Sequence, residues 1–343
     1  MPDTILEVKN LKACFHLDEG QLRAVDGVSF AIQREETLGV IGESGCGKSV
    51  TALSILRLLM PPGKIEGGEI LYYSDDNQVT DLAKLHPNGE QIRKIRGKEI
   101  AMIFQEPMAS LSPVHTIGAQ MMEFILLHNP GMKKNEAQEI ALDMLNKVGV
   151  SNPALRLQNY PHQLSGGMCQ RVMIATALSC NPRLLICDEP TTALDVTVQA
   201  QIIDLMEELQ AEMGMSMLYI THDLGVIAEV ADEVAVMYLG KIVEKCDVKT
   251  IFKKPMHPYT QRLMQSVPKL GSRQEMLDTI EGTVPIPIGM GAQCGFYSRC
   301  SHAEEGSCSR RSPALVEVEP GHFVRCFKYG SVEEGYLESA NQI

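Results

Sequence analysis

The stretch LGVIGESGCGKS, residues 38–49, decides the fold of this chain. Its first five residues form an apolar run, which is typical of a strand buried on both faces of a sheet. Residues 42–49 match the phosphate-loop pattern G-x-x-x-x-G-K-[ST]. Such a loop wraps backbone N–H groups around a phosphate at the start of a helix. A glycine-rich turn with a surface lysine is the alternative, and the strand before the loop argues against it.

Within this loop we expect Lys48 to pair with the β- and γ-phosphates and Ser49 to bind Mg²⁺. The loop residues expected at the nucleotide are Gly42, Ser44, Gly45, Cys46, Gly47, Lys48, Ser49 and Thr51. A helix is predicted to start near Gly47 and to run to about Met60, where Pro61-Pro62-Gly63 stops it.

A second apolar run, LLICDE at 184–189, ends in two acids. Asp188 could reach Mg²⁺ directly or through water. Glu189 would face the γ-phosphate and orient or deprotonate the attacking water. Two acids after a strand are often only the start of a solvated loop, but the phosphate loop upstream favours the catalytic interpretation.

Strands and helices alternate along residues 5–250, which predicts an α/β layer fold with a largely parallel sheet. Strands are expected within 5–42 and at 98–104, followed by helices over about 112–182. A further helix should end at Gly214, and the hairpin at 233–246 is expected to close the domain.

Composition limits the partners. The chain has 343 residues and a net charge of −12, which suggests about two domains and disfavours nucleic acid as a partner. The start of the sequence does not look like a signal peptide, and no window is apolar enough for a membrane helix. We therefore expect a cytosolic chain, or one attached to a membrane only through other proteins.

The string LSGGMCQR at 164–171, together with the phosphate loop and DEPTTALD at 188–195, resembles the ATP-binding subunits of ABC transporters. The resemblance covers about residues 5–250. It implies a P-loop ABC-type ATPase domain with an antiparallel β subdomain and a helical subdomain at about 106–182. The departure from the family pattern is Met168, where the family has Gln.

The resemblance also implies that ATP binds between two such domains. One supplies the phosphate loop, and the other supplies Ser165, Gly166 and Gly167. Because this chain carries one half-site of each kind, it needs a second ABC ATPase subunit. A heterodimer is favoured over a homodimer.

Other site residues are implied by the same resemblance. Gln105 would reach the metal or the attacking water, His222 would contact the γ-phosphate, and Asp195 lies in a loop that crosses to the opposite subunit. Phe15 is the candidate for stacking on adenine, with His16 as the neighbouring alternative. Taken alone, Gln105 is more often a surface residue and His222 a structural residue at a strand end, and Phe15 could be a core or strand-edge phenylalanine.

The segment PMHPYTQRLMQSVP at 255–268 resembles one found in dipeptide, oligopeptide and nickel importers, as does CGFYSRC downstream. This implies an ATPase that powers peptide import, with nickel or oligosaccharide as alternatives. The expected partners are two permeases and an extracytoplasmic solute-binding protein, with the chain bound peripherally at the cytoplasmic face of the inner membrane. A soluble ABC-type ATPase acting on ribosomes or DNA is disfavoured by the single ATPase domain and the acidic charge.

The expected domains are therefore 1–252, a cysteine-containing extension at 253–330, and a tail at 331–343. Within the extension, Cys294, Cys300, Cys308 and Cys326 are spaced C-x5-C-x7-C-x17-C, unlike common zinc motifs. A [4Fe–4S] cluster is implied by the resemblance, Zn²⁺ and free thiols remain alternatives, and such a cluster could gate the ATPase. Arg299, Arg310 and Arg311 are interpreted as surface or cluster-neighbouring charges.

Overall fold

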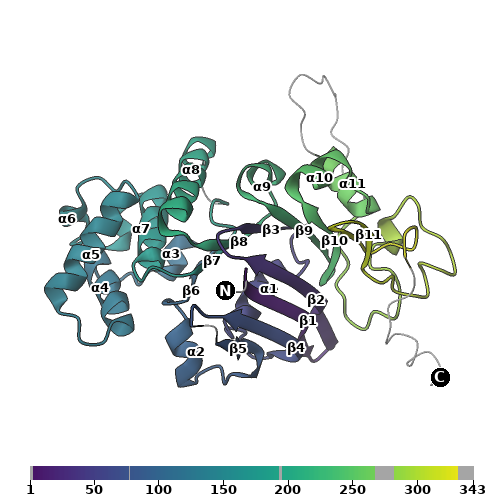
Figure 1. Cartoon of the computed structure of the whole chain (residues 1–343), viewed down its shortest axis with the longest axis horizontal. Coiled ribbons are helices and arrows are strands. Elements are labelled where there is room, and N and C mark those ends of the chain that lie inside the picture. Colours follow the sequence, from purple (N-terminus) through teal and green to yellow (C-terminus); the bar gives the residue numbers. More distant parts are fainter. Residues whose placement is uncertain (1–2, 77, 193–194, 267–281, 331–343) are drawn as a thin grey trace. The chain divides into compact units, whose positions relative to one another are not determined.

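The computed structural model divides the chain into two compact units (Figure 1). The described residues are 3–76, 78–192, 195–266 and 282–330. The first unit comprises Met1–Ala31, Thr37–Lys84 and Thr221–Ile343, and the second comprises Ile32–Glu36 and Leu85–Ile220. The tail expected at 331–343 lies outside the described residues.

The first unit contains an antiparallel sheet with the strand order β2-β1-β4-β5. Its strands are β1 (Thr4–Leu17), β2 (Gly20–Gln33), β4 (Gly63–Tyr73) and β5 (Val79–Asp81). Apolar side chains of β1 such as Leu6, Val8 and Leu11 are buried, while Lys9 and Asn10 are exposed. This alternation is what a sheet with one solvated face requires, and it gives the antiparallel subdomain that the resemblance implied.

A second set of strands in the first unit carries the phosphate loop. β3 (Thr37–Ile41) is entirely buried and runs parallel to β9 (Glu233–Tyr238), which forms the predicted hairpin with β10 (Lys241–Asp247). The sheet continues beyond this hairpin, because β12 (His322–Val324) pairs with β10 and β11 (Val316–Glu319) pairs with β12. The backbone groups along the outer edge of β10 need partners, and a strand almost eighty residues later supplies them.

The helical segments of the first unit are α1 (Lys48–Ile55), the 3₁₀ turn Leu82–Lys84, α9 (Leu224–Val230), α10 (Val248–Lys253), α11 (Pro258–Gln265) and the 3₁₀ turn Tyr297–Arg299. The prediction that α1 runs to Met60 was wrong. Arg57 adopts a left-handed conformation with φ 56°, so the helix ends before the prolines are reached. α11 begins within the HPYT segment, with His257 as its N-cap.

The second unit contains the parallel strands β6 (Ile100–Ile103), β7 (Leu184–Asp188) and β8 (Ser216–Thr221). All three are buried, which matches their continuous apolar sequences. The helices are α2 (Glu90–Ile95), α3 (Pro107–Ser110), α4 (Ile117–His128), α5 (Lys134–Lys147), α6 (Pro153–Arg156), α7 (Gly166–Leu178) and α8 (Val196–Met213), with a 3₁₀ turn at Pro161–Gln163. α4, α5 and α7 pack together (Figure 1), and α8 ends at Gly214 as predicted. No helix among the described residues is long and apolar enough to cross a membrane.

Candidate nucleotide site

The phosphate loop joins β3 to α1, and two of its glycines are fixed by close backbone packing. A Cβ atom at Gly42 would lie 2.2 Å from the carbonyl oxygen of Met237, and one at Gly47 would lie 2.2 Å from that of Ala24. Gly47 also has φ 103°, a conformation that side chains disfavour. The backbone of the loop can therefore pack this closely only with glycine at positions 42 and 47.

Lys48 lies at the start of α1 and is only 5% exposed. Its ammonium donates hydrogen bonds to the carbonyl oxygens of Gly42 at 2.8 Å and Glu43 at 3.3 Å. These contacts hold the charge inside the loop, where a phosphate would bind. Thr51 is also buried, but its hydroxyl donates to the carbonyl oxygen of Gly47 at 2.9 Å, so it supports the helix start.

Glu43 is a loop residue that the sequence did not single out. Its backbone N–H donates to the hydroxyl of Tyr259 at 2.9 Å, and Tyr259 is fully buried at the start of α11. Tyr259 belongs to the HPYT segment, and the resemblance of this segment to peptide importers was the only sign in the sequence that Tyr259 has a role. Sequence spacing could not show that a tyrosine 216 residues later contacts this loop.

In the second unit, the structure brings Gln105 and Glu189 together. The Gln105 amide donates to Oε2 of Glu189 at 3.1 Å, and the Thr192 hydroxyl donates to the same oxygen at 3.0 Å. Asp188, one residue earlier, is buried at the end of β7. Glu189 has φ 48°, a left-handed conformation that is strained for glutamate. The carboxylate is therefore held in a defined orientation at the carboxyl edge of parallel strands, where ligands bind in open α/β sheets.

The segment LSGGMCQR starts α7. Ser165 is its N-cap, and its hydroxyl oxygen accepts a hydrogen bond from the N–H of Met168 at 3.3 Å. Ser165 and Gly166 are exposed, and a Cβ atom at Gly166 would meet nothing within 4 Å. The three residues expected to meet a phosphate thus lie together at an exposed helix start.

Two other expected residues flank helices as well. Asp195 is the N-cap of α8 and accepts from the N–H of Val198 at 3.0 Å. His222 is exposed directly after β8, immediately before Asp223, which caps α9. The structure places both at strand or helix ends, where polar side chains can reach a ligand.

Phe15, expected to stack on adenine, lies opposite Gly63 in the pairing of β1 with β4. Its ring covers that glycine closely, since a Cβ atom at Gly63 would lie 2.7 Å from Cε1 of Phe15. The neighbouring alternative, His16, is ion-paired with Glu66 at 2.9 Å. The half-buried Phe15 ring is therefore the more available of the two for stacking.

The four clustered cysteines are half-buried, and Cys300, Cys308 and Cys326 lie near enough to Cys294 to act on its thiol electrostatically. The N–H of Cys294 donates to the carbonyl oxygen of Cys308 at 2.8 Å. Burial raises the pKa of Cys294 to about 12, and the other three thiols raise it further. The backbone N–H groups of Phe296, His302 and Lys328 offset part of the rise in the pKa values of Cys294, Cys300 and Cys326 respectively.

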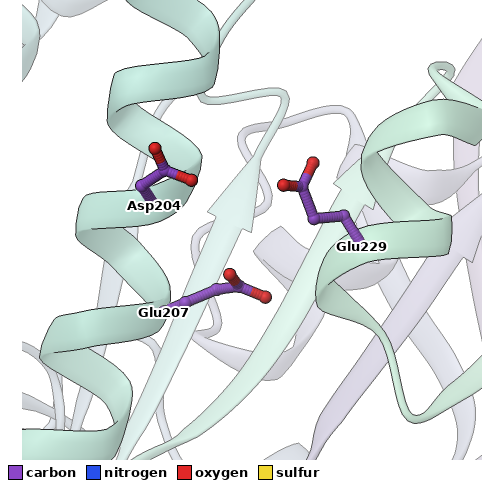
Figure 2. A group of neighbouring side chains, drawn as sticks. All are labelled: Asp204, Glu207 and Glu229. Carbon is purple, nitrogen blue, oxygen red and sulfur yellow. The ribbon is translucent and has the colours of Figure 1, made fainter.

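Exposed acidic residues occur elsewhere on the surface. Figure 2 shows Asp204 and Glu207 on α8, and Glu229 on α9. None of these carboxylates belongs to a motif described above. They carry no ligand assignment.

Comparison with known proteins agrees with this architecture. The ABC transporter family model matches residues 25–192, and the model for the C-terminal region of oligopeptide/dipeptide transporters matches residues 243–308. The solved dimer of the ATP-binding cassette MJ0796 bound to ADP and Pi shares 27% identity and a TM-score of 0.62, covering 71% of this chain and 99% of that one. The fold and the site define an ABC-type ATPase.

Relatives over the full length narrow the class. The chain is 48% identical over 336 residues to the oligopeptide transport ATP-binding protein AppD of Bacillus subtilis, covering 98% of this chain and 99% of AppD. It is 44% identical over 322 residues to the dipeptide transport ATP-binding protein DppD of Escherichia coli, covering 94% and 96%. The chain belongs to the ATP-binding proteins of ABC transporters, in the branch that carries the oligopeptide/dipeptide C-terminal region.

Proposed function

We propose that this chain is the ATP-hydrolysing subunit that powers import of dipeptides or oligopeptides through a membrane ABC transporter. The observation that carries the proposal is the pairing of two features in one chain. It holds a phosphate loop, and it holds a C-terminal region of the oligopeptide/dipeptide type whose Tyr259 contacts that loop. Full-length similarity to peptide transport ATP-binding proteins supports the same substrate class.

In the phosphate half of the site, Lys48 would pair with the β- and γ-phosphates, and the loop N–H groups would bind their oxygens. The ligands offered to Mg²⁺ are the Ser49 hydroxyl, Asp188 and Gln105. When bound, the ion would neutralise negative charge on the phosphates. Hydroxyl, carboxylate and amide oxygens are the donors that this hard cation prefers.

The chemical step falls to Glu189, which would accept a proton from the attacking water. Gln105 and Thr192 both donate to its Oε2, so they fix the direction of the carboxylate. His222 would contact the γ-phosphate, and Phe15 would stack on the adenine. Together these residues hold the water and the phosphate in line, which is most of what an enzyme contributes to phosphoryl transfer.

The site needs a second ABC ATPase subunit, because the chain has one phosphate loop and one LSGGM segment. Ser165, Gly166 and Gly167 would close on the nucleotide of the partner, and Asp195 would lie in the loop that crosses to it. We propose a heterodimer bound to two permeases and supplied by a solute-binding protein, peripheral at the cytoplasmic face of the inner membrane. The ATPase part would occupy residues 1–252, with a helical subdomain at about 106–182, and the extension residues 253–330.

We also propose that Cys294, Cys300, Cys308 and Cys326 hold a [4Fe–4S] cluster. Four thiols gathered in one small region suit iron or zinc. A single Zn²⁺ with Zn–S bonds of about 2.3 Å needs sulfurs roughly 4 Å apart, and no three of these four described thiols lie within 4.8 Å of one another. A [4Fe–4S] cluster holds its thiolates farther apart because its irons occupy the corners of a cube, so thiols that lie outside zinc distance of one another are compatible with a cluster.

Co-purification tests the transporter role. The tagged chain is isolated from gently solubilised native membranes, and its partners are identified by mass spectrometry. Two permeases, a second ATPase and a solute-binding protein are expected, and peptides should then stimulate ATP hydrolysis by the reconstituted complex. Recovery of ribosomes or soluble partners alone would contradict the proposal, and stimulation by nickel or oligosaccharides would correct the substrate.

Iron and sulfide analysis tests the cluster. Anaerobically purified protein should be brown and contain about four irons per chain, and Cys300→Ser should lower the iron content. Cys180→Ser is the matched control, since Cys180 is half-buried but lies outside this group. Colourless protein with bound zinc or no metal would contradict the assignment.

A further inference from the structure

Arg299 connects the cysteine-containing extension to the phosphate loop. It lies in the 3₁₀ turn just before Cys300, and its side chain is only 4% exposed. Its guanidinium makes two hydrogen bonds to the Glu43 carboxylate, Nη1 to Oε2 at 2.7 Å and Nη2 to Oε1 at 3.0 Å. This two-pronged geometry is the strongest form of an arginine–carboxylate pair. Of the two interpretations that the sequence offered, a surface charge and a charge neighbouring the cysteines, this burial excludes the first.

The guanidinium has further partners that fix its position. Nη1 donates to the hydroxyl of Tyr238 at 3.3 Å, the cation lies 5.9 Å from the centre of that ring, and Nη2 donates to the carbonyl oxygen of Gly282. The pairing with Glu43 raises the pKa of Arg299 well above its usual range. A buried, paired charge of this kind is costly to leave without its partner.

Glu43 is thus held at two points by residues from the C-terminal part of the chain. Arg299 binds its side chain, and Tyr259 accepts from its backbone N–H. Tyr259, Tyr238 and Phe296 pack against one another, with ring centres 4.7 to 5.5 Å apart. The C-terminal part of the chain therefore contacts the phosphate loop through Arg299 and Tyr259, and the packed aromatic rings support both contacts.

The same residue supports the phosphate-binding lysine. The carbonyl oxygen of Glu43 accepts a hydrogen bond from the Lys48 ammonium. A displacement of Glu43 would move one of the two carbonyl groups that hold Lys48. Contacts thus run without a break from Arg299 through Glu43 to the group that would bind the β- and γ-phosphates.

The other end of this chain of contacts is the cysteine turn. The N–H of Tyr297 donates to the carbonyl oxygen of Cys294 at 3.0 Å, and the N–H of Cys300 donates to that of Tyr297 at 3.3 Å. Arg299 lies inside the second of these two consecutive turns. A change at either cysteine would move the backbone that carries the guanidinium.

We infer that Arg299 is a positioning residue that couples the Cys294–Cys300 turn to the phosphate loop. A change at either cysteine that displaces the backbone of this turn would therefore change the affinity of the chain for ATP. The extension is then a regulatory element of the nucleotide site as well as an appended segment. The inference concerns ATP binding by this chain and holds whichever solute is transported.

The first test measures ATP affinity of the purified full-length chain by calorimetry. Arg299→Ala should weaken ATP binding about twofold to thirtyfold, the range expected for a residue in a coupling network. Arg299→Lys keeps the charge but loses the two-pronged geometry, so it should give an intermediate loss. Arg310→Ala, an exposed arginine of the same extension, is the control and should bind ATP as the unmodified chain does.

The second test asks whether the coupling runs through Arg299. Cys300→Ser should change ATP affinity in the unmodified chain and have little further effect in the Arg299→Ala background. If Arg299→Ala does not fold, Glu43→Gln replaces it, because it weakens the same pair and keeps the N–H bond to Tyr259. Two results would overturn the inference. One is an unchanged ATP affinity in both Arg299→Ala and Glu43→Gln. The other is a Cys300→Ser effect on ATP affinity that is absent, or that is equally large in the unmodified chain and in the Arg299→Ala background.

Discussion

Helices α1 and α7 both begin where a phosphate is expected, but the two helix starts are built differently. α1 follows Gly47, which gives it no side-chain cap, and its first residue is the buried Lys48. α7 is capped by Ser165, an exposed residue whose hydroxyl oxygen accepts from Met168. The first start combines a backbone turn with a buried positive charge, whereas the second presents a neutral hydroxyl.

This difference suggests two kinds of phosphate contact. The α1 start holds its cation in place through the carbonyl groups of the loop, which suits tight binding within one chain. The Ser165 hydroxyl accepts a hydrogen bond with its oxygen and still has its own proton to donate. It can therefore cap α7 and at the same time bind a phosphate oxygen of a nucleotide held by a partner subunit. Such a contact is weaker than an ion pair, which suits a site that opens and closes.

Glu189→Gln should impair the hydrolysis step and leave the phosphate contacts of both helix starts intact. Removing the acid–base group should lower turnover about a hundredfold to ten-thousandfold, while ATP affinity stays near that of the unmodified chain. Single-turnover and binding measurements on the assembled complex check this, with Glu207→Gln, an exposed glutamate of α8, as the control. Near-normal hydrolysis would remove Glu189 from the role of base.

Lys48→Ala should remove the phosphate contact at the start of α1 and leave the start of α7 unchanged. Loss of a buried, hydrogen-bonded charge should weaken ATP binding by at least about thirtyfold. Calorimetry on the isolated chain measures this, and thermal unfolding shows whether the loop still folds. ATP binding within threefold of the unmodified chain would mean that the loop N–H groups suffice.

Substitutions of Ser165 test the dual role of the α7 cap. Ser165→Ala should lower the free energy of unfolding by about 1 kcal/mol, because the cap is lost. Ser165→Asp should keep the cap but repel a phosphate. Both variants should reduce turnover of the assembled complex and leave ATP affinity of the isolated chain unchanged. Full turnover in Ser165→Asp would contradict a phosphate contact at this helix.

A third helix start should make stability depend on pH. His257 caps α11 with its Nδ1, which accepts from the N–H of Tyr259, and burial lowers its pKa from 6.5 to about 3. Between these values the unfolded chain binds a proton that the folded chain excludes, so stability falls as the pH falls from about 6.5 toward 3. The expected slope is at most about 1.4 kcal/mol per pH unit. His257→Asn, which keeps an acceptor without this titration, should flatten the dependence seen in urea unfolding.

The sequence predicted local elements well because their causes are local. The apolar runs at β3 and β7 and the glycine at the end of α8 are visible in a few consecutive residues. The length of α1 was missed because its end depends on the left-handed Arg57, which no residue preference signals.

The site was predicted in part for the same reason. Gln105 and Glu189 were singled out by motifs, and the structure adds the contact between them. The Arg299–Glu43 pair spans 256 residues, and the pairing of β12 with β10 is similarly distant. Neither leaves a pattern in the sequence, since only the folded chain brings the partners together.

The left-handed conformation of Glu189 has a consequence for how such a chain can evolve. A glutamate at φ 48° carries a strain of about 1 to 3 kcal/mol, which glycine would not. Glu189→Gly would relieve this strain, but it would lose the hydrogen bonds from Gln105 and Thr192 together with the proposed base. The strain and the hydrogen bonds act in opposite directions on stability, so thermal stability alone is a weak reason to keep an acid at this position, and a requirement for ATP hydrolysis is the stronger one.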